Sequence, residues 1–147
     1  MATDDSSLRP GEIEITNQEE KLWRQVNPSW VHDGRVSSQL FRPTPKDTGE
    51  VSVTRASLVT PEVAYGHHTG VLGYASAGVY YVDVAEVHEV ELRAIDDTQV
   101  DDGDERPPAH AYIDFKSVQS KGDQQRRASK LRDKAEKHGW QYGPVEN

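Results

Sequence analysis

Cysteine is absent from all 147 residues of this chain. This absence excludes disulfide bonds, thiolate nucleophiles and every zinc or iron–sulfur site that depends on cysteine ligands. No apolar run approaches the roughly 20 residues that a membrane span requires. The opening residues, MATDDSSLRPGEIEI, lack the apolar stretch of a signal peptide. We therefore expect a soluble, cytoplasmic protein with no membrane partner.

Apolar residues are scarce as well, at 34% of the chain against 29% charged residues. Three tryptophans, six tyrosines and several valine-rich runs are nevertheless more than a disordered chain would hold. The length is typical of one domain. We expect a disordered polar tail over residues 1–17 and a single domain over residues 18–143.

Alternating or β-branched segments predict the strands of this domain. The strongest is SAGVYYVDV, residues 76–84, which is rich in valine and tyrosine. Other predicted strands cover residues 21–26, 35–41, 51–54, 91–95 and 109–115. The intervening RPTPKDTGE, residues 42–50, contains two prolines and is predicted to be an ordered surface loop.

Capping residues predict two short helices. Thr60 followed by Pro61 is typical of a helix start, because the threonine hydroxyl caps the first turn and proline suits the first helical position. Asp83 and Glu86 have the spacing of a capping box, which predicts one or two helical turns after residue 83.

One longer helix is predicted near the C-terminus, over residues 123–138, with Asp123 as its N-cap and Gly139 at its end. Its narrow apolar stripe consists of Ala128, Leu131 and Ala135. The expected fold class is therefore α+β: a mixed or mainly antiparallel sheet, one packed C-terminal helix, and one or two short helices.

Charge is unevenly distributed along the chain. Residues 96–105, DDTQVDDGDE, contain six acids and no base, and we expect a solvated acidic loop over residues 96–108. The spacing of a calcium-binding EF-hand is absent there, and no histidine spacing indicates a metal site, so no metal is predicted.

Arg24 is the first candidate site residue. It stands within a predicted strand between aliphatic neighbours, where a buried guanidinium requires an anion or a hydrogen-bonded partner. Two interpretations remain open. Arg24 binds a phosphate or carboxylate, or it lies on an edge strand with its head group in water.

Ser37 and Ser38, between Arg35 and Arg42, form the second candidate. Successive strand residues face opposite sides, so only one of the two serines can line a given pocket. Serine and arginine on neighbouring strands can hold a nucleotide phosphate or ribose. No nucleophile elbow marks either serine, and the alternative is a pair of solvated serines on a strand.

His110 and Asp114 are the third candidate, because a spacing of four residues places both on one face of a strand. A histidine beside a carboxylate can act as a general acid or base. The alternative is a hydrogen bond at the edge of the core. Together with Arg24, Ser37 and Ser38, these two residues are the catalytic candidates that the sequence offers.

A basic surface is the fourth candidate, and the C-terminal helix supplies much of it. Its bases are spread over several helix faces without interleaved aromatics, so nucleic acid is not the favoured partner, and the net charge of −8 argues against it too. Nucleic-acid binding would have to use this helix. The predicted binding surface for a protein partner comprises Arg35, Arg42, Lys46, Arg126, Arg127 and Lys130.

The segments LWRQVNPSWVHDGRVSSQLFRPTPKD, GVYYVDV and HAYIDF together resemble a group of small, functionally uncharacterised bacterial proteins. This resemblance covers most of residues 22–142 and implies no activity. A more distant likeness is to the ADP-ribosyltransferase fold, in which an early strand offers arginine or histidine and the next offers serine or threonine. Arg24 and Ser37 or Ser38 would take those positions, and Asp114 or Glu91 would stand for the late catalytic glutamate.

Two functions are predicted from these observations. The first is a protein-interaction module that uses no cofactor. The alternative is a nucleotide-handling enzyme, most concretely an ADP-ribosyltransferase-like protein with NAD as cofactor. In that enzyme Arg24 would hold the phosphates, a serine the ribose, and a carboxylate would face the developing positive charge. The alternative requires these side chains to meet in one pocket.

Overall fold

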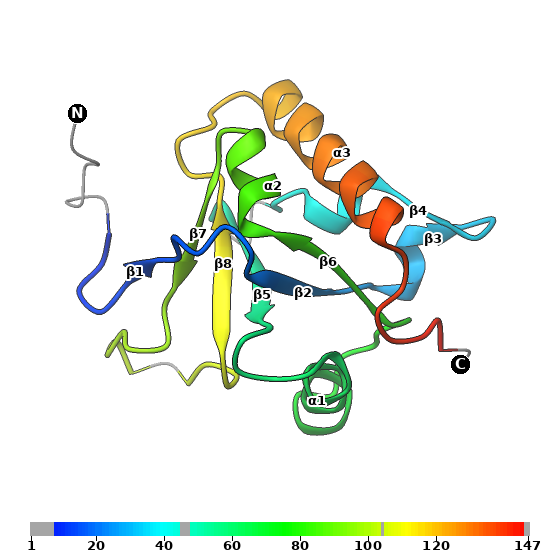
Figure 1. Ribbon diagram of the computed structural model, residues 1–147, viewed down its shortest axis with the longest axis horizontal. Coiled ribbons are helices and arrows are strands. Elements are labelled where there is room, and N and C mark those ends of the chain that lie inside the picture. Colours follow the sequence, from blue (N-terminus) through cyan, green and yellow to red (C-terminus); the bar gives the residue numbers. More distant parts are fainter. Residues whose placement is uncertain (1–7, 45–47, 104, 146–147) are drawn as a thin grey trace.

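The computed structural model describes residues 8–44, 48–103 and 105–145 (Figure 1). Six strands form one antiparallel sheet in the order β1-β7-β8-β5-β2-β6. They are β1 (Ile13–Glu14), β2 (Lys21–Gln25), β5 (Glu50–Arg55), β6 (Val79–Asp83), β7 (Arg93–Asp96) and β8 (His110–Asp114). A separate short hairpin pairs β3 (Val31–His32) with β4 (Arg35–Val36).

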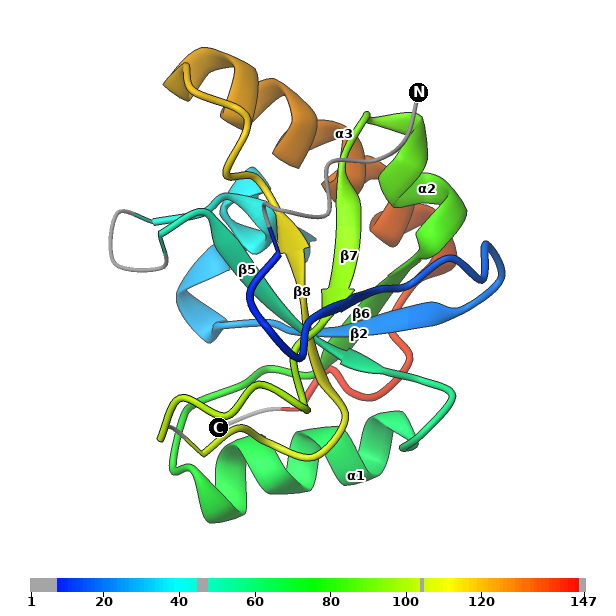
Figure 2. The same cartoon turned by 90° about the vertical axis from the view of Figure 1, so that its left-hand side faces the viewer.

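Helices flank the sheet on opposite sides. The helices are α1 (Pro61–Gly66), which continues into the π-helix η5 (His67–Val71), α2 (Val84–Glu89), α3 (Lys121–His138), and the 3₁₀ turns η2 (Pro28–Trp30) and η3 (Ser38–Phe41). Figures 1 and 2 place α2 and α3 on one side and α1 on the other. The predicted α+β domain with a packed C-terminal helix is confirmed. None of the helices in the described ranges is long and apolar enough to cross a membrane.

The main core lies between the sheet and α3. Ala128, Leu131 and Ala135, the predicted apolar stripe, have no exposed surface. The N-cap of α3 is Ser120, whose side chain accepts a hydrogen bond from the backbone N–H of Asp123. The predicted N-cap, Asp123, is therefore wrong by one turn. The caps predicted at Thr60 and at Asp83 with Glu86 are both present.

The strand predicted over residues 35–41 is wrong beyond Val36. Ser37 caps the 3₁₀ turn η3 by accepting a hydrogen bond from the backbone N–H of Gln39. Leu40 and Phe41 are both fully buried. In a strand these neighbours would face opposite sides of the sheet, whereas a tight helical turn lets both side chains reach the core under α3.

The predicted tail over residues 1–17 differs from the structure in its later part. Ile13 and Glu14 form β1 at one edge of the sheet, paired with β7. Glu12 and Ile15 on either side of it are buried. The Tyr112 hydroxyl donates to Glu12 over 2.7 Å, which gives this acid a partner within the core.

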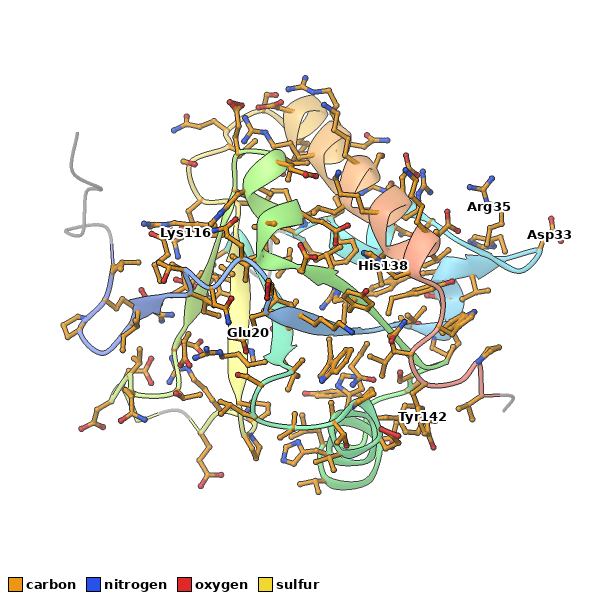
Figure 3. The ribbon with its side chains drawn as sticks, in the orientation of Figure 1. Glu20, Asp33, Arg35, Lys116, His138 and Tyr142 are labelled. Atoms are coloured by element: carbon orange, nitrogen blue, oxygen red, sulfur yellow. The ribbon has the colours of Figure 1, made fainter. Side chains whose placement is uncertain are left out.

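The residues after α3 return to the sheet. Trp140 stacks on Tyr80 with ring centroids 4.4 Å apart, and Tyr142 pairs with the backbone of Val79. Figure 3 shows Tyr142 beside α1, where its ring lies 4.7 Å from that of Tyr65. The C-terminal segment therefore contacts both sides of the sheet.

Candidate functional site

A pocket of about 480 Å³ opens on the side of the sheet that carries α1. Its floor comes from β2, β5 and the start of β8, and its walls come from α1, η5 and the segment before β8. Trp23 anchors α1 to the floor, since it packs against Ala64 and its indole N–H donates to the carbonyl of Val59 over 2.9 Å. The polar side chains of the lining are Arg24, Gln25, Ser52, Thr54, His67, His68, Glu105, Arg106 and His110.

Ser52, His110 and Asp97 form a continuous hydrogen-bonded chain at this floor. His110 Nε2 lies 3.2 Å from Ser52 Oγ, and His110 Nδ1 lies 2.7 Å from Asp97 Oδ1. Ser52 is exposed to the pocket, whereas Asp97 is 2% exposed. The histidine thus connects a solvent-facing hydroxyl to a buried acid.

The register of the sheet explains this arrangement. Ser52 pairs with Tyr112 and Thr54 with His110, so Ser52 and His110 are diagonal neighbours on one face of β5 and β8. Asp97 directly follows β7, the strand on the other side of β8. Strands β5 and β8 and the residue after β7 therefore bring one side chain each to the same place.

The acid of this chain is held by Arg106. Arg106 Nε donates to Asp97 Oδ2 over 3.0 Å, and its Nη atoms donate to Asp102 over 3.0 and 2.8 Å. Asp96, the preceding residue, is buried as well. The prediction of a solvated acidic loop is therefore wrong for Asp96 and Asp97, because arginines neutralise these two acids inside the protein.

The tautomer of His110 follows from its two partners. An ionised carboxylate only accepts hydrogen bonds, so Nδ1 of a neutral His110 carries the proton that it donates to Asp97. Nε2 is then an acceptor, and Ser52 Oγ donates to it. A histidine in this state is ready to remove the serine proton.

Arg24 also reaches this site, although not from an edge strand. Because β2 lies between β5 and β6, the edge-strand interpretation of Arg24 is wrong. Its Nε donates to the carbonyl of Leu40 over 2.6 Å and its Nη1 to the carbonyl of Ser52 over 2.8 Å. The guanidinium also lies 5.3 Å from the centre of the Trp30 ring. Arg24 thus places a cation against the backbone carbonyl of Ser52.

Ser37 and Ser38 do not line the pocket. Ser37 caps η3, and the neighbouring Val36 carbonyl accepts a hydrogen bond from Arg132 of α3 over 3.1 Å. Of the residues in the ADP-ribosyltransferase hypothesis, Arg24 therefore lines the pocket, whereas Ser37 and Ser38 do not.

Asp114 is not the partner of His110. Although both stand on β8, Asp114 accepts a hydrogen bond from Arg93 Nε over 3.0 Å and another from the backbone N–H of Lys116. The pairing that the spacing predicted is therefore wrong, because the acid that reaches His110 is the residue that follows the neighbouring strand β7 and does not come from β8 itself.

The predicted basic surface does not line the pocket. Arg126 and Arg127 pair with Asp123 on the same helix, and Arg127 also donates to the carbonyls of Val90 and Glu91. Arg35 pairs with Glu136 and lies on the outer end of the β3–β4 hairpin (Figure 3). Arg42 follows η3 and Lys130 is exposed on α3. Lys46 lies outside the described residues.

Apolar side chains gather beside the pocket. Six large hydrophobic side chains are exposed in the described part of the chain, and five of them lie between residues 58 and 74. We call these five the apolar rim: Leu58, Val63, Val71, Leu72 and Tyr74. All but Leu58 also line the pocket.

His68 stands between the rim and the floor. Its ring lies 5.4 Å from that of Tyr74. Burial and the nearby positive charge of Arg24 lower the pKa of His68, which keeps its imidazole neutral. Within residues 8–44, 48–103 and 105–145, no group of three histidine or acidic side chains is placed to hold a metal ion.

Sequence reasoning named His110 and Arg24 and missed Ser52, Asp97 and the apolar rim. The alternation of VSVT gave a usable signal for Ser52, since it places Ser52 and Thr54 on the opposite face from two valines. No sequence signal distinguishes Asp97, because it is one of six acids within residues 96–105. The rim consists of ordinary apolar residues whose exposure depends on the tertiary fold.

Comparison of the chain with protein-family models, with curated proteins and with solved structures found no match. The geometry of the pocket and its surroundings is therefore the basis for a functional proposal.

Proposed function

We propose that this protein is a protein-interaction module whose binding surface consists of the pocket and the apolar rim. The gathering of five exposed large hydrophobic side chains on one side of the molecule supports the proposal. Isolated exposed apolar residues are ordinary, but a contiguous group beside a concave site is typical of a surface that another molecule covers.

The partner is a protein segment with apolar anchor side chains. A volume of about 480 Å³ suits one or two such side chains, and its walls include Val59, Val63, Pro107 and Pro108. The other four members of the rim are exposed and also line the pocket, whereas Leu58 is exposed outside the pocket lining. A segment that fills the pocket can therefore also cover the rim.

Peptides selected from a random displayed library against the native protein test this proposal. We expect the selected peptides to share aromatic or aliphatic anchors. They should bind at least about tenfold more weakly to Val63→Glu and to Val71→Glu. Each substitution introduces a carboxylate that the bound peptide would remove from water, and burial of an unpaired charge is costly. Calorimetric titration measures the affinities.

Gln125→Glu is the matched control, since it adds the same charge on α3, at the opposite side of the sheet. Its affinity for the peptides should equal that of the unmodified protein. Selection that enriches no peptide above an unrelated bait would contradict the proposal. Equal binding to the Val63 and Val71 variants would contradict it as well.

A further inference from the structure

We propose that the pocket also carries an acyl-transfer site, in which Ser52 is the nucleophile, His110 the general base and Asp97 the positioning residue. The substrate class is a carboxylic ester with a small apolar acyl group. This activity goes beyond binding of a partner and does not depend on it, because Ser52, His110 and Asp97 carry the chemistry and none of them belongs to the apolar rim.

The geometry meets the requirements of a serine nucleophile. Such a site needs a hydroxyl within hydrogen-bond reach of a histidine whose other nitrogen is held by an acid. Here those separations are 3.2 Å and 2.7 Å. The hydroxyl faces an open pocket, and the acid is buried behind the histidine. Water reaches the serine, and the histidine is held in one orientation.

Arg24 brings a positive charge to the backbone of Ser52 within the same pocket lining. Arg24 Nη1 donates to the Ser52 carbonyl over 2.8 Å, so the guanidinium lies beside the reacting residue. A fixed cation close to the ester carbonyl stabilises the oxyanion that forms when the hydroxyl adds to it. The apolar walls at Val59 and Pro107 can hold the acyl chain.

Each step balances with water as the only second reactant. Ser52 Oγ bonds to the ester carbonyl carbon while its proton moves to His110 Nε2. The oxyanion then collapses, the carbon–oxygen bond to the alcohol breaks, and His110 returns the proton to the departing alcohol. Water, deprotonated by His110, next attacks the acyl-serine ester, and Ser52 leaves with the proton. The products are one acid and one alcohol.

A fluorophosphonate reagent tests the nucleophile directly. Attack by Ser52 Oγ forms an oxygen–phosphorus bond and releases fluoride, and peptide mass mapping then locates the label. We expect the label on Ser52, its absence in Ser52→Ala, and labelling of His110→Gln at least about 100-fold slower, the usual contribution of a general base. Hydrolysis of p-nitrophenyl butyrate should fall in parallel.

Ser29→Ala is the control, because Ser29 is an exposed serine on η2 outside the pocket lining. It should leave both readouts unchanged. Asp97→Asn should shift the pH profile of hydrolysis, since an amide can hold His110 in the other tautomer. Thermal melting of each variant confirms that it is folded. Ser52 is exposed, so its alanine variant should melt like the unmodified protein.

No label on Ser52 after hours with excess reagent would overturn the proposal, and so would labelling of His110→Gln at the original rate. Failure here is distinct from failure of the interaction proposal. Ser52→Ala should abolish labelling and still bind the selected peptides. Val63→Glu should lose the peptides and keep its reactive serine.

Discussion

Arg55 of β5 forms a bidentate ion pair with Glu20, in which Nη2 and Nε donate to the two carboxylate oxygens over 2.6 and 3.0 Å. The same guanidinium donates to Asp96 of β7 over 2.7 Å. Glu20 is 5% exposed and also accepts hydrogen bonds from Ser57. One arginine therefore connects the residue that precedes β2 with two further strands.

Replacement of Arg55 by glutamine should strongly destabilise the fold. It leaves the buried carboxylates of Glu20 and Asp96 without their cation, and loss of one partner of a buried ion pair costs about 3–5 kcal/mol. Urea unfolding measures the effect. Arg35→Gln is the control: Arg35 is exposed at the hairpin, and its removal should barely move the urea midpoint. Equal midpoints for the two variants would contradict this prediction.

Stability should fall when the solution is acidified from about pH 5. Burial by itself raises the pKa values of Glu12, Glu20 and Asp96, but hydrogen bonds donated to each carboxylate outweigh it and hold each pKa below its ordinary value. Near pH 4 the unfolded chain therefore binds protons that the folded chain does not, so acid favours unfolding. The stabilisation from these three ionised carboxylates is complete above their pKa values in the unfolded chain, about 3.9 to 4.3. It is lost as the pH falls through their lower pKa values in the folded protein.

Glu20→Gln separates this contribution from the rest. A neutral glutamine resembles a protonated glutamate, so the stability difference between this variant and the unmodified protein should shrink between pH 7 and pH 3. Urea titrations at several pH values measure it. A difference that stays constant across this range would show that Glu20 has no part in the acid response.

Gly78→Ala should destabilise the protein by about 1–3 kcal/mol, the usual cost of overpacking. Gly78 has a φ of +147°, and an added Cβ would collide with the Tyr142 carbonyl and lie 2.9 Å from the Trp140 ring. Gly122→Ala on α3 is the control, since nothing lies within 4 Å of its added Cβ. It should raise stability by up to about 1 kcal/mol. A thermal melt that ranks the two variants in the opposite order would contradict this account.

Local patterns predicted much of the fold. The alternation in residues 21–26 and the valine and tyrosine run before Asp83 are strands because neighbouring side chains serve opposite faces. Thr60 and Asp83 cap helices because their side-chain oxygens satisfy backbone N–H groups only a few residues away. Such rules succeed because both partners lie within one short segment.

Relationships between distant segments could not be predicted in the same way. Spacing along one strand pairs His110 with Asp114, yet the acid that holds His110 is Asp97, which follows the neighbouring strand β7. Nothing in the order of residues gives the register that places Ser52 diagonally from His110. The strand predicted for Leu40 and Phe41 is wrong for a related reason, since burial under α3 decides their conformation.

The strand order has a consequence for how the chain folds. Among the described strands of the six-stranded sheet, β2 pairs with β5 and β7 with β8, and in each pair the second strand is the next one of this sheet along the chain. By contrast, β1 pairs only with the much later β7, and β2 and β5 gain their second partners only with β6 and β8. Each of these pairings closes a long loop before it gains any contact, which is slow compared with local hairpin formation. During synthesis one side of β5 therefore stays unpaired until Asp114 has been added. A nascent chain with such an open strand edge is vulnerable to aggregation until β8 has been added.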